Sequence, residues 1–205
     1  WFDRISGAGL SPDLQCYNAV LDSFAETGDL RSAERWFRRM LASSVSLDAC
    51  TLNLLLKCCA VGGHTDESGH WLGRMLSLRL QPDQASYYSL VKSCAQGGDL
   101  VSAGHWMEAM SSARFEPDLL CYNAVLTGLS RRGEMLEAMR WFGRMREARL
   151  APNEASYTCL VQGFSRAGKF ASAEREFQLM VEDRLSPTIV SFKVMLGACA
   201  RHGMF

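Results

Sequence analysis

Residues 117–145, PDLLCYNAVLTGLSRRGEMLEAMRWFGRM, decide the fold, because they contain two apolar patterns of helical spacing with a break between them. The first pattern covers residues 119–131, and Gly133 then interrupts it. The second pattern covers residues 135–147. Its apolar side chains fall on one side of a helix: Ala138, Trp141, Phe142 and Met145. The stretch therefore predicts a hairpin of two short helices, each about 20 Å long.

The same pattern recurs along the chain with a period of 35 residues and no insertion; residues 12–40, PDLQCYNAVLDSFAETGDLRSAERWFRRM, are another copy. Steps from proline to a polar residue occur at Pro12-Asp13, Pro82-Asp83, Pro117-Asp118, Pro152-Asn153 and Pro187-Thr188, with Leu47-Asp48 in the same register. The other columns are Tyr17, Leu52, Tyr87, Tyr122, Tyr157 and Phe192; Gly28, Gly63, Gly98, Gly133, Gly168 and Gly203; and Met40, Met75, Met110, Met145 and Met180. Proline cannot continue a helix, so each step separates one hairpin from the next. Four columns with one period indicate a repeat protein.

The period divides the chain into the end of one repeat (1–13), five full repeats (14–48, 49–83, 84–118, 119–153 and 154–188) and the first helix of a further repeat (189–205). A single short hairpin buries only one face, so its neighbours must stack on it. We expect an all-α fold, a right-handed α-solenoid of stacked helix-turn-helix repeats, with a concave groove lined by the first helices and no β-strand. The tryptophans of the second helices are interpreted as core residues, against the alternative of a ladder that stacks on RNA bases: Trp36, Trp71, Trp106 and Trp141.

Composition narrows the classes of function. The 205 residues include 22 basic and 22 acidic side chains, so the formal net charge is zero. This balance argues against a protein that coats nucleic acid through a general cationic excess. No apolar run approaches the ~20 residues of a membrane span, so no membrane-spanning segment is predicted. The chain opens at Trp1 without a leader, and we expect a segment of a longer protein whose targeting peptide lies elsewhere.

The eight cysteines and four histidines complete no zinc pattern, since no C-x-x-C pair occurs. We interpret the cysteines as free thiols that pack as small apolar side chains in a reducing compartment, and we expect no metal and no cofactor. The H-x-E signature of a zinc deaminase is absent. Glu67 and His70 lie near His64 without a third ligand or a general base. The segment is therefore predicted not to be an enzyme.

The units resemble the pentatricopeptide repeat. Residues 12–40 and 117–145 match its Y-N-x-(L/V)-(I/L)…G…A…F-x-x-M…P-D run, and the resemblance covers the whole chain. The uninterrupted 35-residue spacing is similar to the pure subclass of that family. The Trp-Leu-Gly-Tyr pattern on the first helix of tetratricopeptide repeats is absent from these units.

The resemblance implies a groove for single-stranded RNA that takes one base per repeat. It assigns base reading to the fifth and last residues of each unit. Those pairs are Asn18 with Asp48, Asn53 with Asp83, Tyr88 with Asp118, Asn123 with Asn153, and Thr158 with Thr188, and the partial unit offers Lys193 alone. A carboxylate only accepts hydrogen bonds, so Asp favours the ring N–H of U or G, whereas an Asn amide can donate to C or A. In the family, Asn at the fifth position goes with pyrimidines and Thr or Ser with purines.

The resemblance also assigns the second residue of each unit, usually Val, to sandwiching the base. These residues are Gln15, Cys50, Ala85, Leu120, Ala155 and Val190. Tyr88 and Thr188 depart from the usual residues at base-reading positions. The Asp and Asn residues after each proline step have a second interpretation, because such residues cap helix N-termini in proteins that never touch RNA.

Charge is uneven along the chain. Residues 1–118 carry 10 basic and 14 acidic side chains, whereas residues 119–205 carry 12 and 8. Family members often carry a cation for RNA phosphate near the end of the first helix. Candidates occur only in the second half, where ordinary solvated helix ends are the alternative: Arg131, Arg132, Arg166, Lys169 and Arg201.

Two functions fit these patterns. One is a sequence-selective RNA-binding module of a mitochondrial or chloroplast factor for RNA processing, stability or translation. With RNA running parallel to the chain, the pairs predict 5′-U-U-(U/G)-C-(A/G)-3′. The other is a helical scaffold in an organellar complex such as a ribosome, contacting protein or structured RNA without base reading. Zero net charge and two irregular pairs favour the scaffold, whereas the intact register and three regular pairs favour RNA reading. The expected partners are single-stranded RNA and proteins of an organellar ribonucleoprotein complex.

Overall fold

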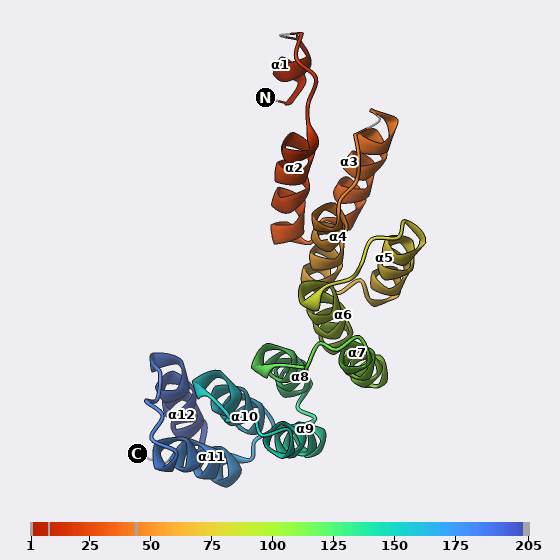
Figure 1. The fold of residues 1–205 in the computed structure, drawn as a ribbon. Coiled ribbons are helices and arrows are strands. Elements are labelled where there is room, and N and C mark those ends of the chain that lie inside the picture. Colours follow the sequence, from red (N-terminus) through yellow and green to blue (C-terminus); the bar gives the residue numbers. More distant parts are fainter. Residues whose placement is uncertain (1, 8, 44, 203–205) are drawn as a thin grey trace. The chain divides into compact units, whose positions relative to one another are not determined.

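The computed structural model describes residues 2–7, 9–43 and 45–202, and these residues form helices and turns without a β-strand (Figure 1). The chain divides into two compact units, residues 1–115 and 116–205. The first unit holds α1 (Phe2–Gly7), α2 (Leu14–Thr27), α3 (Leu30–Ala42), α4 (Ala49–Gly62), α5 (Thr65–Ser77), α6 (Gln84–Gly97) and α7 (Leu100–Ser112). The second unit holds α8 (Leu119–Arg132), α9 (Met135–Glu147), α10 (Glu154–Arg166), α11 (Phe170–Glu182) and α12 (Ile189–His202). Within this described part, no helix has the length and apolar character that crossing a bilayer requires.

The first helix of each full repeat starts at a capping residue and stops at or beside a glycine. The side chains that accept backbone N–H groups of the first turn are those of Asp13, Asp48, Asp83, Asp118 and Asn153. The glycines have φ between 71° and 83°, a region that only glycine enters without steric cost: Gly28, Gly63, Gly98, Gly133 and Gly168. These two columns of the sequence explain why the first helices have nearly equal lengths.

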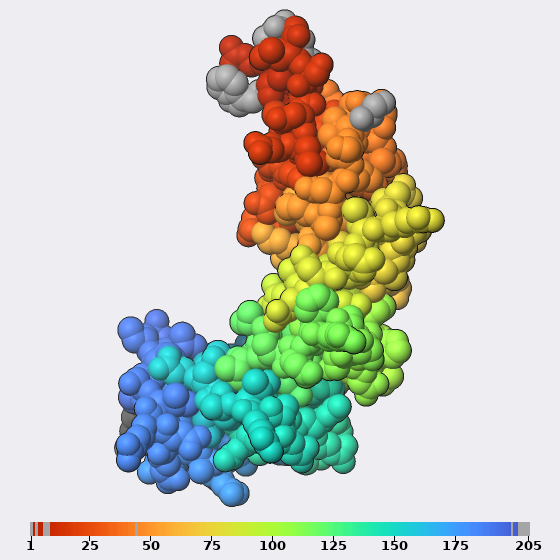
Figure 2. Space-filling model, in the orientation of Figure 1, coloured from red at the N-terminus to blue at the C-terminus, as the bar shows by residue number. Residues whose placement is uncertain are grey.

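Packing follows the repeat order within each unit. First helices pack on first helices, α2 on α4 and α4 on α6 in one unit, and α8 on α10 and α10 on α12 in the other. The second helices α3, α5, α9 and α11 also pack against the first helix of the next repeat. Successive repeats therefore follow one another along the surface of each unit (Figure 2). The predicted all-α stack of helix-turn-helix repeats is confirmed.

The core lies between the two helix layers. Met40, Met75, Met110, Met145 and Met180 are fully buried, and burying one such side chain is worth about 1.5–3 kcal/mol. Two of the tryptophans, Trp71 and Trp141, are also buried. The other two are partly buried and pack against the core of the first unit: Trp36 and Trp106. The tryptophan column is therefore part of the core, as its place beside the apolar stripe predicts.

Candidate nucleic-acid interface

A hydrogen-bond network joins the fifth residue of α4 to the last residue of the same repeat. Nδ2 of Asn53 donates to Oδ1 and Oδ2 of Asp83 at 3.2 and 3.1 Å. The hydroxyl of Ser86, on α6, donates to Oδ1 of Asn53 at 2.5 Å. Three polar side chains from two consecutive repeats are thus held together at the N-terminal end of α6.

The same network recurs in the second unit. Nδ2 of Asn123 donates to Oδ1 of Asn153 at 3.2 Å, and the Ser156 hydroxyl donates to Oδ1 of Asn123 at 2.7 Å. Asn123 lies on α8, and Ser156 lies on α10. Because the two networks are equivalent in geometry, their one chemical difference is a carboxylate at Asp83 and an amide at Asn153.

The helix cap orients both last-position side chains. Oδ1 of Asp83 accepts from the backbone N–H of Ser86 at 2.9 Å, and Oδ1 of Asn153 accepts from that of Ser156 at 3.1 Å. Only the oxygen of an amide can accept these bonds, so Nδ2 of Asn153 points away from the helix end. The atom that points away from the helix end is therefore an acceptor in Asp83, Oδ2, which also accepts from Asn53, and a donor in Asn153, Nδ2.

The Asn18 and Asp48 pair is bridged by a third side chain. The Thr51 hydroxyl oxygen lies 2.8 Å from Oδ1 of Asn18 and 2.8 Å from Oδ1 of Asp48. Asp48 also caps α4 through the Thr51 backbone N–H at 2.8 Å. The first repeat therefore brings its fifth and last residues together through a shared hydroxyl.

The two irregular pairs differ from the regular ones. The Thr158 hydroxyl donates to the Glu154 carbonyl at 2.6 Å, and Oγ1 of Thr188 accepts from the Ser191 backbone at 3.2 Å. No hydrogen bond joins Thr158 to Thr188 in the described residues. For the other pair, Tyr88 lies on α6 of the first unit, while Asp118 caps α8 of the second.

Sequence analysis missed the third residue of each repeat. The hydroxyl residues at this position are fully buried: Thr51, Ser86, Ser156 and Ser191. In two repeats the position is Cys16 or Cys121, which cannot donate an equivalent strong hydrogen bond. The signal in the sequence is a Ser or Thr three residues after the last-position residue, the spacing of a reciprocal helix cap, which forms fully at Asp83 and Asn153.

The residues predicted to sandwich bases are all exposed on the first helices, with Leu120 at 59% and Val190 at 49% exposure: Gln15, Cys50, Ala85, Leu120, Ala155 and Val190. Large apolar side chains at such exposure are available to a planar ligand. Their role in clamping bases stays a prediction.

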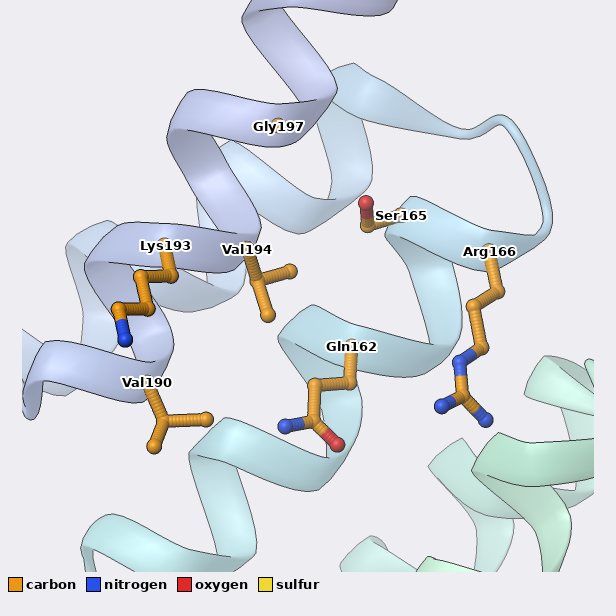
Figure 3. Close-up of a pocket in the computed structure, with 7 residues that line it drawn as sticks. All are labelled: Gln162, Ser165, Arg166, Val190, Lys193, Val194 and Gly197. Atoms are coloured by element: carbon orange, nitrogen blue, oxygen red, sulfur yellow. The ribbon is translucent and has the colours of Figure 1, made fainter.

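A cavity of about 360 Å³ lies between α10 and α12. Its lining residues are Gln162, Ser165, Arg166, Val190, Lys193, Val194 and Gly197. In Figure 3 the two valines project from α12 toward Gln162, and Arg166 extends from the last turn of α10. Apolar side chains beside cations can accommodate a base together with its phosphate. Lys193, the fifth-position residue of the partial repeat, also lines this cavity.

The other predicted phosphate contacts are less uniform. Arg131 is exposed at the end of α8, but Nε of Arg132 bonds to Oε1 of Glu134 at 2.6 Å. Lys169 is exposed at the N-terminus of α11. The side chain of Arg201 lies outside the described part of the structure. Arg131, Arg166 and Lys169 are therefore the candidates that carry no internal ion pair in the described residues.

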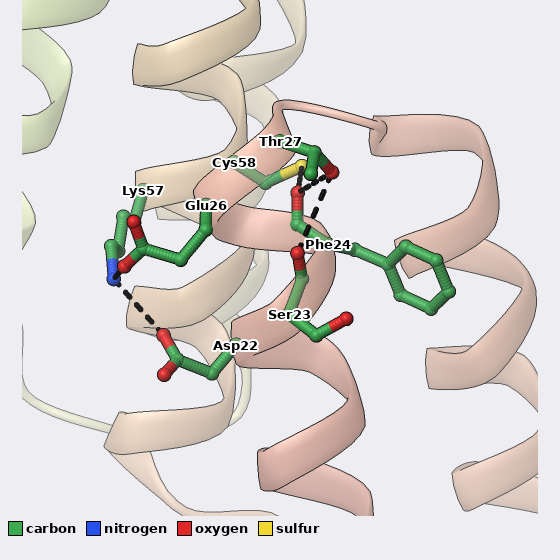
Figure 4. Close-up of polar contacts among 7 residues, drawn as sticks. All are labelled: Asp22, Ser23, Phe24, Glu26, Thr27, Lys57 and Cys58. Atoms are coloured by element: carbon green, nitrogen blue, oxygen red, sulfur yellow. Dashed lines mark hydrogen bonds and ion pairs between the residues drawn. The ribbon is translucent and has the colours of Figure 1, made fainter.

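In the first unit, an ion-pair cluster lies on the first helices, where the second unit has its predicted phosphate contacts (Figure 4). Nζ of Lys57, on α4, bonds to Oδ1 of Asp22 at 3.0 Å and to Oε1 of Glu26, both on α2. The hydrogen bonds that Lys57 donates to Glu26 and, to a lesser extent, to Asp22 raise the pKa of its ammonium group. Glu26 occupies the position in its repeat that Arg131 and Arg166 occupy in theirs. The cation of this surface is thus neutralised by two carboxylates.

Comparison with known families identifies the class of protein. Residues 12–61, 117–166 and 152–201 match the PPR repeat family, and residues 72–129 match the pentatricopeptide repeat domain. These matches cover most of the chain, which therefore belongs to the pentatricopeptide repeat family. No curated protein sequence matches the chain.

Solved structures share the fold at low sequence identity. PPR10 from maize, in complex with an 18-nt psaJ RNA element, is 20% identical, with a TM-score of 0.62 over 100% of this chain and 35% of its own. The nuclear proteinaceous RNase P 2 of Arabidopsis thaliana is 19% identical, with a TM-score of 0.67 over 92% of this chain and 43% of its own. The PPR domain of A. thaliana protein-only RNase P 1, in complex with tRNA, is 18% identical, with a TM-score of 0.66 over 89% of this chain and 96% of its own. The chain thus spans about a third of the length of the maize protein.

Proposed function

We propose that this chain binds single-stranded RNA along its first helices and reads one base per repeat with the fifth and last residues. The observation that carries the proposal is the network of Asn123, Asn153 and Ser156. It immobilises both predicted reading side chains before any ligand arrives, and preorganised polar groups lose less conformational entropy on binding. A helix cap alone requires only the bond from Asn153 to the Ser156 backbone, not the additional bond from Asn123.

The cap geometry supports a definite base at each regular repeat. Oδ2 of Asp83 offers an acceptor and suits U, whose ring nitrogen carries a proton, whereas Nδ2 of Asn153 offers a donor and suits the unprotonated ring nitrogen of C. The pair of Asn18 and Asp48 matches that of Asn53 and Asp83, so both select U. Tyr88 with Asp118 accepts U or G, and Thr158 with Thr188 selects a purine. The proposed site is 5′-U-U-(U/G)-C-(A/G)-3′.

The cellular role is also part of the proposal. We assign the chain to a non-enzymatic factor that acts in RNA processing, stability or translation in a mitochondrion or chloroplast, where the family generally acts. The RNA ligands named for the maize and tRNA-bound structures support the ligand class. The compartment needs its own test, since another relative of similar fold is a nuclear protein. Imaging the full-length protein fused to a fluorescent tag checks it.

Selection of bound RNA from a random pool tests the proposal. We expect the enriched sequences to share U-U-(U/G)-C-(A/G). Enrichment of a different motif would refute the assignment of bases, and no enrichment above the starting pool would refute RNA binding itself.

The scaffold function remains the second candidate because one observation favours it. In the first two repeats, Asp22 and Glu26 neutralise the charge of Lys57, and RNA affinity depends on such cations. If the chain is a scaffold, the selected RNAs should share no motif, or no RNA should bind. The random-pool selection therefore separates the two functions.

A further inference from the structure

The turn that follows each second helix has a left-handed residue. In α9, the Leu150 backbone N–H donates to the Met145 carbonyl at 3.1 Å, and that of Arg149 donates to the Arg146 carbonyl at 2.9 Å. The end of α11 has the same pair of bonds through Leu185 and Arg184. This double closure requires a residue of positive φ at the helix end, a position where glycine is usual.

Arginine occupies this position in four repeats, whereas Gly9 fills it in the partial repeat at the start of the chain, with a φ of 73°. The φ angles are 57° to 67°, at Arg79, Arg114, Arg149 and Arg184; the equivalent Ser44 lies outside the described residues. By contrast, glycine fills the left-handed position at the end of every full first helix. A left-handed conformation is sterically unfavourable for any residue with a Cβ, so a strained arginine retained four times points to a task for its side chain.

Nothing in the described residues occupies these guanidinium groups. Arg149 and Arg184 are exposed, and neither forms an ion pair there with the nearby Glu147 or Glu182. Other arginines of the unit do form such pairs, as Arg140 does with Glu137 at 2.5 Å. The two arginines therefore present unneutralised charge.

A hollow of about 460 Å³ connects the two turns in the second unit. It is lined by residues 149–152 of one turn, by Asp183 and Leu185 of the next, and by Arg146. Asp183 is engaged by the Tyr157 hydroxyl, which donates to Oδ2 at 2.5 Å. The hollow thus combines the guanidinium groups of Arg146 and Arg149 with one carboxylate that already has a partner, and Arg184 directly precedes its lining residue Leu185.

These arginines stand at the opposite end of the first helices from the predicted phosphate contacts. Arg149 precedes the N-terminus of α10 and Arg166 ends it, and α10 has 13 residues, which span about 20 Å. A single strand has one phosphate backbone, so a strand held at Arg131 and Arg166 does not reach Arg149 and Arg184 at the other end of the first helices. These two arginines are therefore available to the phosphates of a second strand.

We infer that Arg149 and Arg184 bind the phosphates of a base-paired RNA segment that adjoins the single-stranded site on its 3′ side. Guanidinium groups bind phosphate through two parallel hydrogen bonds, and RNA helices are recognised mainly through shape and backbone. The inference rests on the proposed function, and it adds a structured flank to the ligand.

The test compares two RNA probes. One is an eight-nucleotide single strand that contains the selected motif, and the other is the same strand continued at its 3′ end into a ten-base-pair hairpin. The protein variants are Arg149→Gly with Arg184→Gly, and Arg131→Ala with Arg166→Ala. Affinities are measured by titration at several salt concentrations. Glycine is chosen because it fits the left-handed turn, so the double glycine variant is expected to fold at least as stably as wild type.

We expect wild type to bind the hairpin probe more tightly than the single strand, and the double glycine variant to lose that advantage. Its slope of log Kd against log salt on the hairpin should fall by roughly one to two, for two lost phosphate contacts. Its affinity for the single strand should not change, whereas the double alanine variant should weaken on both probes.

A hairpin advantage that persists in the double glycine variant would overturn the inference. So would a lowered melting temperature without a change in binding, because the arginines would then serve only to stabilise the helix C-terminus. Failure of wild type to bind either probe would instead refute the proposed function.

Discussion

Asn153 can cap a helix and also serve as a base reader in the proposed function, because each task uses a different atom. Its Oδ1 caps α10 and accepts from Asn123, while its Nδ2 is left free at an exposed site. The two interpretations that the sequence leaves open, helix cap and base reader, are therefore compatible. The sequence predicts the residue but not the orientation of its amide, which depends on Ser156 in the same helix and on Asn123 in the preceding repeat.

Replacing Asn153 separates the two tasks. Asn153→Ala removes the cap, and loss of such a cap lowers the free energy of unfolding by about 1 kcal/mol. Asn153→Asp keeps the capping oxygen and should stay within about 0.5 kcal/mol of wild type, the range of a change that breaks no key contact. Urea titrations of the three proteins check this. Equal destabilisation by Ala and Asp would contradict the assigned cap geometry.

Glu176 is a charged residue in an apolar column of the repeat. It occupies the position that Trp36 and Trp141 fill in other repeats, and it is 5% exposed with Oε2 lacking a hydrogen-bond partner in the described residues. Burial raises the pKa of its carboxyl, against the opposing charges of Arg175 and Arg146. A raised pKa in the folded state means that stability present below the usual value near 4.5 is lost as pH rises.

Glu176→Gln should therefore stabilise the protein at neutral pH and have progressively less effect toward pH 4. Urea unfolding of both proteins between pH 4 and 7.5 measures the difference in free energy. Capping carboxylates such as Asp29, whose pKa is lowered by bonds from Ser32, are present in both proteins and cancel in the comparison. A difference that is constant across this range would show that the Glu176 charge does not destabilise the fold.

At the scale of the secondary-structure elements, the start and end of each helix could be predicted from the sequence. The patterns over 119–131 and 135–147 correspond to α8 (Leu119–Arg132) and α9 (Met135–Glu147). Apolar periodicity, capping residues and glycines all act locally, so each helix end has a signal in its own sequence. The left-handed Arg149 gave no such signal, because a helix end of this kind normally shows a glycine.

Contacts between side chains of different repeats could be predicted only after the stacking of the first helices was known. Asp22 and Lys57 are 35 residues apart, so a constant register places them side by side once the first helices are known to stack. The division between residues 115 and 116 has no counterpart in the sequence, because the 35-residue register continues through it.

Releasing Lys57 should strengthen RNA binding. Asp22→Asn with Glu26→Gln removes both of its partners, which are more than half exposed, so the melting temperature should change little. The freed ammonium group should raise affinity several-fold and steepen the salt dependence by ~0.7 for one added contact on a single strand. Salt-controlled titration with a single-stranded RNA of the selected motif measures both.

Glu34→Gln provides the control, because Glu34 pairs with Arg38 at 3.2 Å on the second helix α3. It removes a carboxylate from an ion pair without freeing Lys57, and it should leave RNA affinity near that of wild type. An unchanged affinity in the double variant would place Lys57 outside the RNA path.

At the scale of the whole molecule, the proposed function requires successive repeats to select successive bases of the RNA. Family membership and the helical stack follow from the sequence because they depend on a period. The proposed base reading depends on a few atoms, of which Oδ2 of Asp83, an acceptor, and Nδ2 of Asn153, a donor, differ most clearly. These two positions allow a reciprocal exchange of specificity with the cap intact in both variants.

The decisive measurement is the affinity of Asn153→Asp and Asp83→Asn for RNAs that carry U or C at the fourth and second positions. Asn153→Asp should change the fourth base from C to U, and Asp83→Asn should change the second from U to C. By analogy with a specific base contact, each change should shift discrimination by about 1–3 kcal/mol. If both folded variants retain the wild-type preferences, the repeats do not read bases, and the protein acts as a scaffold instead.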